Sequence, residues 1–428
     1  MSTYDAVVVG AGIFGLSTAY HIKKLRPKDR ILVIDQLSAA GQGNTAKSAA
    51  MFRCVFYSRT NLTLVDTSVE FYRHVYEKLK VDLKLKWTGY LWLFSEQEYK
   101  EISPVLQSLA ERGLEYKSFD EKELAEKLNM NTHVNNDEEA QMMGLADANV
   151  GIFVPKAGSI DIDELVKFYE SEFKKMGGVT QYNTRVDSII IEPETSLGIP
   201  GEPYFWQHPH ATGVKTNRGE IKAKKTIIAA GAWATTLLDN IGIDTPSQPI
   251  KRQLFTVRAS TDSLKQLLHA KGFGKENCMP FTILPNPRVY IKPALEEGSF
   301  WFSYGDDFPR AFKLEDDPQP EENYYQYGLY QVATKYFPQF AGCQPSSAWA
   351  GQYALNTLDG QPAIFEEGDV IVVGSCSGSG NMKGDAVGRI AAALYAGEEY
   401  ALLYGEKEFK ISDLGLKQRK VEPEKLII

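Results

Sequence analysis

Near its N-terminus the chain carries three glycines in the pattern G-x-G-x-x-G, at Gly10, Gly12 and Gly15. The β-branched run YDAVVV before them is typical of a buried parallel strand, and GIFGLSTAYHIKK after them has a helical apolar period. Asp35 ends a second predicted strand, RILVI. Such glycines let the backbone approach a pyrophosphate at a helix N-terminus, and the acid can bind ribose hydroxyls. The sequence therefore predicts a dinucleotide-binding β-α-β unit.

Length and charge narrow the class of protein. A chain of 428 residues is too long for one simple core, so two domains with a site between them are expected. The net charge of −8 gives no general attraction to nucleic acid, so we expect no nucleic-acid partner, and an anionic substrate would need its own local cations. The first strand begins close to the N-terminus and no run of eighteen apolar residues occurs. These features predict a cytoplasmic protein without an integral span, and they leave peripheral association at the inner face of the membrane open.

Cysteine and histidine usage predicts no metal site. The four cysteines show no C-x-x-C spacing, and the six histidines show no H-E-x-x-H spacing. Scattered cysteines fit a reducing compartment better than a disulfide framework.

The order of strand and helix signals predicts a discontinuous domain arrangement. An aromatic strand follows residue 86, short alternating runs fill 250–310, and a further strand, glycine-rich loop and helix lie in VIVVGSCSGSGNMKGDAVGRIAAAL. We expect an α/β, Rossmann-like nucleotide-binding domain from residues 1–85, 151–235 and 336–404, a second α+β substrate domain on a mixed or antiparallel sheet from 86–150 and 236–335, and a C-terminal tail from 405–428.

The motifs together resemble the D-amino-acid-oxidase-type flavoprotein superfamily, within it the branch of monomeric sarcosine oxidase, glycine oxidase and dimethylglycine dehydrogenase. A nicotinamide dehydrogenase would account for the first motif but not for the last. The resemblance implies FAD and a glutathione-reductase-type FAD-binding domain. It spans most of the chain, in VVVGAGIFGLSTAYHI, GQGNTAKSAAMFR (41–53), KTIIAAGAWA (225–234), QYALNTLDGQPAI (352–364) and VVGSCSGSGNMKGDAVGRIAAAL (372–394).

The same resemblance implies which residues hold FAD. The N-terminal unit would bind the pyrophosphate and adenosine, and the C-terminal glycine-rich loop and helix would border the flavin ring. The expected FAD-binding residues are Gly10, Gly12, Ile13, Phe14, Gly15, Asp35, Gln36, Thr45, Ala46, Lys47, Ser48, Val186, Ala230, Gly231, Trp233, Tyr353, Gly378, Gly380, Asn381, Met382 and Lys383.

Attachment of the flavin is expected to be non-covalent. Relatives of the sarcosine oxidase type link FAD through a cysteine just before a tyrosine. The position that matches this cysteine, ahead of Tyr353, is Gly351, which has no nucleophile. Cys343 lies too early in the chain and Cys376 lies in the later loop.

Three residues match substrate-side positions of the resembling enzymes. Arg53 matches an arginine that binds the substrate carboxylate, a task suited to the planar guanidinium fork. Lys383 matches a lysine that joins it, and Tyr290 matches loosely an aromatic hydroxyl over the substrate. The structural alternatives are a salt bridge for Arg53, an exposed helix-start lysine for Lys383 and an ordinary strand tyrosine for Tyr290.

The expected electron acceptor follows from a departure from the family. Oxidase relatives present a lysine that assists reaction with oxygen, on a strand that corresponds to SFWFSYGDD (299–307) here. Trp301 lies near the lysine position, and Gly305 near a histidine position. This favours a dehydrogenase that passes electrons to a quinone or a carrier protein.

The leading hypothesis is an FAD-dependent oxidoreductase that oxidises a small anionic substrate by hydride transfer to flavin. The substrate class that the resemblance favours is an N-methyl or secondary amino acid such as sarcosine, dimethylglycine or proline. One alternative is an FAD-dependent alcohol dehydrogenase acting on glycerol 3-phosphate or a 2-hydroxy acid. Another is a non-catalytic FAD-binding subunit. Oligomer formation stays open.

Overall fold

The N-terminal β-α-β unit forms the middle of the first of two large sheets. The structure, a computed structural model, describes residues 3–306 and 312–426. Strand β1 (Tyr4–Val9) lies between β2 (Ile31–Ile34) and β11 (Gly219–Ile228), and all three are parallel. The sheet also contains β8 (Val179–Gln181), β18 (Val370–Gly374), the antiparallel edge strand β17 (Ala363–Glu367), and the antiparallel pair β9 (Val186–Glu192) and β10 (His210–Thr216).

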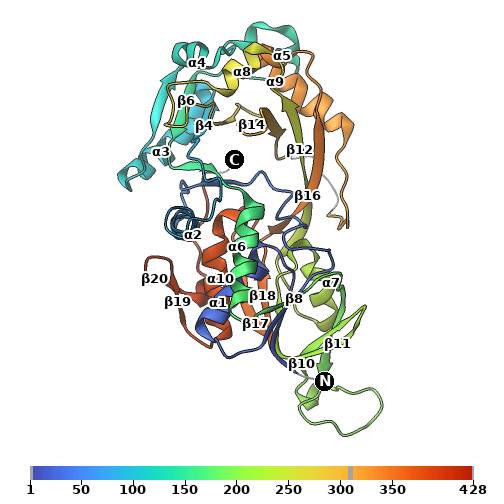
Figure 1. The fold of residues 1–428 in the computed structure, drawn as a ribbon. Helices are drawn as coiled ribbons and strands as arrows, with labels where there is room; N and C mark the ends of the chain where they lie inside the picture. Colours follow the sequence, from blue (N-terminus) through green and yellow to red (C-terminus); the bar gives the residue numbers. More distant parts are fainter. Residues whose placement is uncertain (1–2, 307–311, 427–428) are drawn as a thin grey trace.

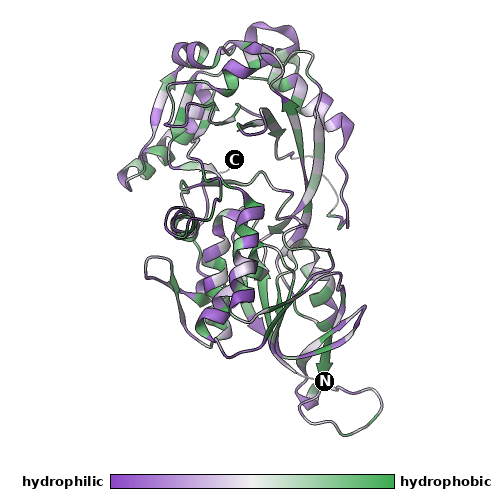
Figure 2. Ribbon diagram, viewed as in Figure 1, coloured by the Kyte–Doolittle hydropathy of each residue, from purple (hydrophilic) through white to green (hydrophobic). Residues whose placement is uncertain are grey.

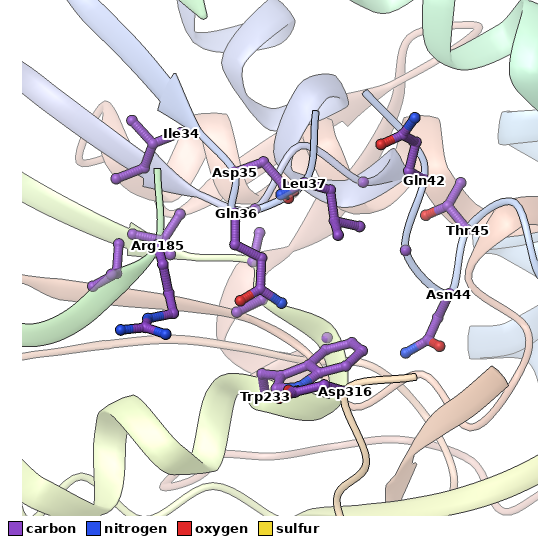
Figure 3. Close-up of a pocket in the computed structure, with 18 of the residues that line it drawn as sticks. Ile34, Asp35, Gln36, Leu37, Gln42, Asn44, Thr45, Arg185, Trp233 and Asp316 are labelled. Carbon is purple, nitrogen blue, oxygen red and sulfur yellow. Dashed lines mark hydrogen bonds between the residues drawn. The ribbon is translucent and has the colours of Figure 1, made fainter. Parts of the chain in front are cut away.

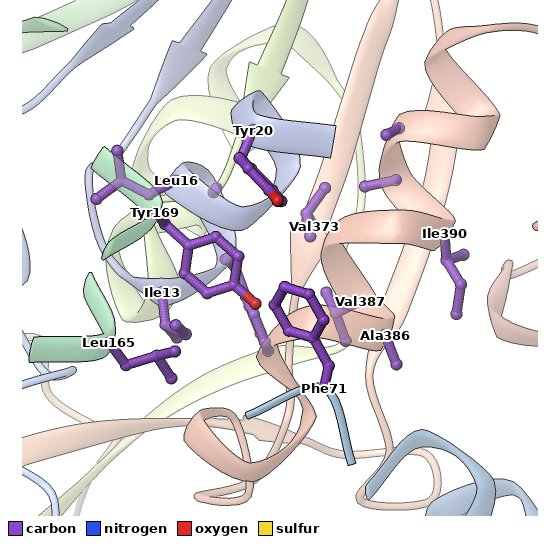
Figure 4. Packing of buried hydrophobic residues seen from close by; sticks show 14 of the residues in the cluster. Ile13, Leu16, Tyr20, Phe71, Leu165, Tyr169, Val373, Ala386, Val387 and Ile390 are labelled. Atoms are coloured by element: carbon purple, nitrogen blue, oxygen red, sulfur yellow. The ribbon is translucent and has the colours of Figure 1, made fainter. Parts of the chain in front are cut away.

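Side chains of this sheet alternate between two cores, as expected for strands buried on both faces. Ala6 and Val8 pack under helices on one face, and Val7 and Val9 pack on the other face with β9 and β10. Figure 4 shows the first of these cores, where apolar side chains of the covering helices pack together, among them Leu16, Phe71, Tyr169 and Val387. The covering helices are α1 (Ile13–Leu25), α2 (Arg59–Glu77), α6 (Ile162–Lys175) and α10 (Gly384–Tyr395), with α7 (Ala234–Leu238) on the opposite face.

A buried carboxylate joins these helices. Asp385, in the first turn of α10, accepts hydrogen bonds from Tyr169 at 3.1 Å and pairs with Arg389 at 2.6 Å. His21 Nε2 of α1 lies 2.8 Å from Asp385 Oδ1, the oxygen that also accepts from Tyr169, and Arg389 contacts Oδ2. Because a buried charge is costly unless it is paired, this network ties α1, α6 and α10 together.

The second sheet is mostly antiparallel and lies beyond the first domain's helices (Figure 1). Its strand order is β16-β12-β15-β14-β13-β4-β6-β5, and β13 and β4 form its parallel pair. The strands are β4 (Tyr90–Phe94), β5 (Lys117–Asp120), β6 (Val150–Val154), β12 (Ser247–Arg258), β13 (Phe281–Ile283), β14 (Tyr290–Ala294), β15 (Ser299–Ser303) and β16 (Ser347–Asn356).

The two faces of this second sheet have different surroundings. Leu91 and Leu93 of β4 face a core formed with short helices at the outer side. Tyr90, Trp92 and Phe94, the alternate residues of β4, face a separate cluster. Helices around this sheet are α3 (Glu96–Glu111), α4 (Glu121–Leu128), α5 (Glu138–Met142), α8 (Asp262–Leu268) and α9 (Gln331–Tyr336).

The predicted fold class is confirmed: a Rossmann-like α/β domain is joined to a domain on a mixed sheet. Two strands pair in the second sheet although the predicted domain ranges place them in the first domain. These are β6, nearly all of which lies in the predicted range 151–235, and β16, all of which lies in the predicted range 336–404. Strand β16 pairs with β12 along its whole length, and this long-range pairing is not visible in the local pattern.

Two small sheets and the C-terminal segment complete the fold. Strand β3 (Met51–Arg53) pairs with β7 (Ala157–Ser159), and β19 (Tyr400–Leu403) pairs with β20 (Lys407–Lys410). The last described residues of the chain, which end at Leu426, lie between the two domains (Figure 1). Polar residues line the outer sides of the helices, and the central strands β1, β2 and β18 of the first sheet are mostly apolar (Figure 2). In the described part of the chain, every helix is too short or too polar to cross a lipid bilayer.

Candidate active site

A cavity of about 820 Å³ opens at the carboxyl ends of β1, β2 and β11. This is the edge at which open α/β sheets bind ligands. Figure 3 shows Asp35, Gln36, Asn44, Thr45 and Trp233 around it. We call this space the cofactor cavity.

Backbone geometry at the glycines shapes one wall of the cofactor cavity. Gly10 has a φ of +107°, and a Cβ atom added there would lie 2.4 Å from the carbonyl oxygen of Ala229. A Cβ on Gly15 would lie 1.8 Å from the carbonyl oxygen of Gly10, so α1 packs directly on the turn.

Helix α1 begins at Ile13, and its N-cap residue Gly12 has no side chain to cap it. The Ile13 N–H donates to Thr45 Oγ1 at 3.2 Å, while later N–H groups of the first turn have no side-chain cap among the described residues. The N-terminus of α1 therefore offers backbone donors and a partial positive charge to an anion.

Asp35 fixes the opposite wall. Its carboxylate accepts hydrogen bonds from the backbone N–H of Ala11 at 2.7 Å and from that of Leu37 at 2.8 Å. The side chain thus ties the end of β2 to the glycine turn while it lines the cofactor cavity. Both carboxylate oxygens retain lone pairs for a further donor, as a ribose hydroxyl would supply.

The structure brings about half of the predicted FAD-binding residues together in the cofactor cavity. Ile13, Phe14 and Gly15 lie behind it in α1, where they are buried. The predicted residues that line it are Gly10, Gly12, Asp35, Gln36, Thr45, Ala46, Lys47, Val186, Ala230, Gly231 and Trp233.

The remaining predicted residues form the junction beside the cofactor cavity. The Asn381 amide donates hydrogen bonds to the Thr45 carbonyl at 3.2 Å and to the Ser48 hydroxyl, so the C-terminal loop is fastened to residues 45–48. Gly378 has a φ of +83°, and a Cβ there would meet the ring of Tyr353 at 2.3 Å. Gly380 lies against Phe14 in the same way, and Met382 is half-buried in the adjoining core. Sequence segments more than 300 residues apart therefore meet at one place.

Several residues of the cofactor cavity were not predicted. Gln42 and Asn44 precede the predicted loop residues, and Arg185 precedes Val186. Asp316 accepts a hydrogen bond from the Trp233 indole at 3.1 Å, and Asp317 pairs with Lys47 at 3.4 Å. The positions next to predicted contacts could have been found by extending each motif by one or two residues. Asp316 and Asp317 come from a loop with no motif of its own.

Arg53 lies at the end of β3, and its side chain is buried with 8% of the residue exposed. Its guanidinium stacks on the ring of Phe56 at 4.3 Å. One nitrogen donates to the Leu426 carbonyl at 3.5 Å, and the buried Nη1 has no partner among the described residues. Burial lowers the pKa of Arg53 because it removes hydration from the guanidinium, and the nearby Tyr90 and Glu424 offset this only in part. A desolvated guanidinium with an orphaned nitrogen is suited to bind an anion.

Lys383 lies in a short helical turn, Asn381–Lys383, ahead of α10, and it is 1% exposed. The alternative of an exposed helix-start lysine is therefore wrong. Its ammonium donates to Asn61 Oδ1 at 2.6 Å and to Ser379 Oγ at 2.7 Å. Burial, together with the nearby charge of Arg53, lowers the pKa of Lys383 to about 8.

The two cations face the same aromatic ring. The Lys383 ammonium lies 5.6 Å from the centre of the Phe56 ring, on which Arg53 also stacks. Neither cation forms an ion pair within residues 3–306 and 312–426. We call Arg53 and Lys383 the cation pair. Two buried positive charges in one place repel each other, so an anion bound between them would be stabilised by both.

Tyr290 belongs to the same region but is less closely joined to it. Its ring packs 4.9 Å from that of Phe281, which in turn lies 4.4 Å from Tyr90. Burial raises the pKa of Tyr290, so its hydroxyl stays protonated and can donate a hydrogen bond. Tyr90, which was not predicted as a site residue, is also buried. Burial raises the pKa of its hydroxyl, and the nearby Arg53 charge offsets part of that rise.

A buried lysine also lies where the sequence indicated none. Lys292 of β14 is paired across the sheet with Trp301, and its ammonium lies 3.7 Å from the indole. The ammonium donates to the Ala49 carbonyl at 2.7 Å, and burial lowers its pKa to about 8. A second cavity of about 330 Å³ is lined by Lys292, Ala46 and Ser48.

Gly305, at the expected histidine position, is close to Arg252 instead. Asp307, which ends the predicted stretch, lies outside the described residues.

A dinucleotide cavity at the carboxyl edge of a Rossmann-like sheet, next to buried cations under a second sheet, defines a flavoprotein oxidoreductase. The chain belongs to the DAO family of FAD dependent oxidoreductases, whose profile matches residues 5–394. FAD is its cofactor, and the uncapped helix, the glycine turn and the size of the cofactor cavity fit that group. The predicted likeness to the sarcosine oxidase and glycine oxidase branch is confirmed.

Curated relatives share less than a third of their residues with this chain. FAD-dependent oxidoreductase domain-containing protein 1 of Bos taurus is 24% identical over 423 residues, which cover 91% of this chain and 80% of the bovine protein. Peroxisomal sarcosine oxidase of Homo sapiens is 24% identical over 255 residues, 58% of this chain and 55% of that protein. The chain spans 61% of the length of a Caenorhabditis elegans relative that is 25% identical.

A solved structure of L-proline dehydrogenase from P. horikoshii has the same fold, with a TM-score of 0.73 at 21% identity, over 98% of both chains. Glycine oxidase from Geobacillus kaustophilus superposes with a TM-score of 0.71 at 17% identity, over 93% of this chain and 96% of that one. Both likenesses concern the fold.

Proposed function

We propose that the protein oxidises the C–N bond of a small amino acid, with an N-methyl or secondary amine as the favoured substrate. The observation that carries this proposal is the cation pair. Arg53 and Lys383 are buried, have no carboxylate partner in the described residues and face one ring. A substrate carboxylate would fill this electrostatic gap and gain two charge-assisted hydrogen bonds.

The residues of the chain have distinct tasks in this reaction. FAD, when bound, accepts the hydride. Arg53 would bind the carboxylate through its free nitrogen and fix the donor carbon in one orientation, and Lys383 would add the second charge. Tyr290, held protonated, would donate a hydrogen bond from the sheet above. An amine that binds in its neutral form needs no strong side-chain base for the transfer.

Family relatives support an amine rather than an alcohol substrate. Their names include sarcosine oxidase, glycine oxidase and L-proline dehydrogenase, which all specify an amino acid. The alternative alcohol substrates, glycerol 3-phosphate or a 2-hydroxy acid, carry anions that the cation pair would also accept. Alcohol oxidation, however, needs a base for the hydroxyl proton. No histidine or carboxylate is hydrogen-bonded to Arg53 or Lys383 in the described residues.

The test is flavin bleaching by candidate substrates without oxygen. The holoenzyme is mixed anaerobically with sarcosine, proline, dimethylglycine, lactate, 2-hydroxyglutarate or glycerol 3-phosphate, and the flavin absorbance is followed. The proposal expects reduction by at least one amine and slower reduction by every alcohol. Reduction by an alcohol alone would contradict it, and no reduction by any compound would favour a non-catalytic FAD-binding subunit.

The acceptor is a separate part of the proposal. We propose a dehydrogenase that uses a quinone or a carrier protein, because Trp301 lies near the position at which oxidase relatives present a lysine. Lys292 supports an oxidase as the second candidate, because its ammonium lies beside Trp301 and against Ala49 in the loop expected to hold FAD. Reoxidation of the reduced enzyme in air, compared between the natural protein and Lys292→Met, separates the two. Fast reoxidation that the substitution abolishes would establish the oxidase.

Attachment of the cofactor can be tested independently. Gly351 lies against Lys47 and Asn44 and offers no nucleophile to the flavin. We propose non-covalent FAD. Acid precipitation should therefore release all of the yellow chromophore into the supernatant, and flavin retained in the pellet would contradict this.

A further inference from the structure

The last described residues of the chain run directly beside the cation pair. Gln361 donates to the Glu422 carbonyl at 2.7 Å, which fastens this segment to the first domain. Leu426 is 3% exposed and packs in the cluster around β4, β6 and α3 of the second sheet. Its carbonyl oxygen faces Arg53 at 3.5 Å. Residues 421–426 therefore connect both domains at the candidate substrate site.

Within this segment, Glu424 is connected to Lys383 through one intermediate side chain. Its carboxylate accepts hydrogen bonds from the backbone N–H of Tyr57 at 2.9 Å and from the Asn61 amide at 3.1 Å. Asn61 is 4% exposed, and its Oδ1 accepts the hydrogen bond from the Lys383 ammonium at 2.6 Å. Glu424, Asn61 and Lys383 thus form a chain of two hydrogen bonds.

The chemistry of an amide gives this chain a fixed direction. An asparagine has donors on one terminal atom and an acceptor on the other. With Glu424 on one side and Lys383 on the other, the nitrogen must face the carboxylate and the oxygen must face the ammonium. The reverse orientation would set an N–H group against the ammonium and an oxygen against the carboxylate. The charges of Glu424 and Lys383 therefore favour the same orientation of Asn61, and Glu424 helps to hold the Asn61 oxygen toward the ammonium.

We propose that Glu424 is a positioning residue of the substrate site, which holds the Lys383 ammonium in its charged, anion-binding state by orienting Asn61. The proposal deepens the proposed function and rests on it, since it assumes that the cation pair binds the substrate carboxylate. It makes Glu424, near the end of the described chain, part of the support of the active site.

The charges around Lys383 set the direction of the expected effect. Arg53 opposes its protonation, and the negative charges of Glu424 and Asp359 favour it. Cys376 also favours the ammonium, and Ser379 contributes a neutral hydrogen bond. Removing the Glu424 charge takes away one favourable interaction and releases Asn61. The pKa of Lys383 should therefore fall below its value in the natural protein.

Glu422 provides a matched control within the same segment. Its carboxylate accepts a hydrogen bond from the backbone N–H of Arg59, the first residue of α2, at 2.6 Å. Glu424 makes a similar hydrogen bond to the backbone N–H of Tyr57, two residues before α2. The Glu422 carboxylate also lies 3.6 Å from Arg112. None of its hydrogen bonds involves Asn61. If Glu424 merely caps α2, the two substitutions should behave alike.

The experiment compares Glu424→Gln with Glu422→Gln in the FAD-loaded full chain. Propionate, a carboxylate without an oxidisable amine, is titrated between pH 6 and 9 and followed by the flavin absorbance and by calorimetry. Because a hydrogen bond to a charged group is being disturbed, Glu424→Gln should weaken propionate binding roughly tenfold. It should also shift the loss of affinity at alkaline pH to lower pH. Glu422→Gln should leave both measurements unchanged.

Further variants keep the test decisive. Asn61→Ser, too short to bridge, should reproduce the effect of Glu424→Gln, and adding Glu424→Gln to it should weaken binding no further. This pair also serves if Glu424→Gln alone yields no folded holoenzyme. Equal behaviour of Glu424→Gln and Glu422→Gln, or additive effects with Asn61→Ser, would overturn the proposal.

Failure of the proposed function gives a different result. If propionate binds as expected but no amino acid reduces the flavin, the reaction is wrong and the positioning role stands. If the natural protein binds no propionate at any pH, the anion site itself is refuted, and the role of Glu424 falls with it.

Discussion

The cofactor cavity and the cation pair are built in opposite ways. The cavity is shaped by backbone: a glycine turn, an uncapped helix and a carboxylate that holds two N–H groups. The cation pair is made of side chains from β3 and from the turn before α10, more than 300 residues apart. In the cavity Trp233 and Lys47 have acidic partners, whereas Arg53 keeps a buried nitrogen without a partner in the described chain.

This difference separates two requirements of an enzyme. A cofactor that stays bound can be held by many ordinary contacts that also stabilise the fold. A substrate that binds and dissociates in every turnover needs a site whose charges and hydrogen-bonding groups lack partners until the substrate is bound. Buried, uncompensated charge costs stability in the free protein and is compensated when the anion binds. Substitutions in the cofactor cavity should therefore lower the free energy of unfolding, whereas substitutions in the cation pair should mainly lower the rate of catalysis.

The largest effect is expected in the backbone-built region, from Gly10→Ala. The added Cβ would lie 2.4 Å from the Ala229 carbonyl at a φ of +107°. We expect a loss of about 3 kcal/mol or more in unfolding free energy, from strain and overpacking together. Purified protein should contain no FAD, as measured by absorbance at the flavin band.

Gly113→Ala is the matched control for this substitution. Gly113 has a φ of +91°, and a Cβ there would meet no atom within 4 Å. It should lose only about 1–2 kcal/mol from the left-handed backbone and keep its FAD. Equal losses from both substitutions would show that close contact at the turn is unimportant.

The second effect, from Arg53→Met, should lie in catalysis rather than in stability. Loss of the guanidinium should lower kcat/KM for the best amino acid by about a hundredfold or more. The melting temperature of the substrate-free enzyme should stay the same or rise, because an apolar side chain replaces a buried charge whose lost hydration is only partly offset.

Arg389→Met tests the contrast between unpaired and paired cations. Arg389 pairs with the fully buried Asp385 at 2.6 Å, remote from the cation pair in function. Its loss leaves that carboxylate with one partner fewer and should cost about 3 kcal/mol of stability. If Arg53→Met lowered the melting temperature and Arg389→Met did not, the contrast between the unpaired and the paired cation would be wrong.

A third effect concerns pH. The pKa of Lys383 is about 8 in the protein without an anion, because burial disfavours the charged form. A carboxylate binds best to the ammonium, so its affinity should be level below this pKa and fall above it by about tenfold per pH unit. Propionate binding to Lys383→Met should lack this step. A step that persists in Lys383→Met would assign the titration to another group.

Predictability from the sequence follows the same division. The glycine turn, Asp35 and the predicted fold class depend on contiguous residues with strong local periods, so they could be predicted. Lys292, Asn61 and Glu424 could not, because each gains its place from strand pairing or from the return of the chain end to the start of α2. Arg53 and Lys383 were found through resemblance, and their burial became visible only in the structure.

The smallest expected effect tests whether side-chain charge matters at all in the cofactor cavity. Arg185 lines the cavity, but its guanidinium is 65% exposed and pairs with Asp187 at 3.0 Å. Arg185→Gln should therefore weaken FAD binding by about twofold, the size of a screened surface interaction. Arg218→Gln, an exposed arginine that does not line the cavity, is the control. A loss above tenfold in FAD affinity at low salt, absent from the control, would mean that the cavity also depends on side-chain charge. In that case both regions would bind their anionic ligands through charged side chains, and they would differ only in how deeply those side chains are buried.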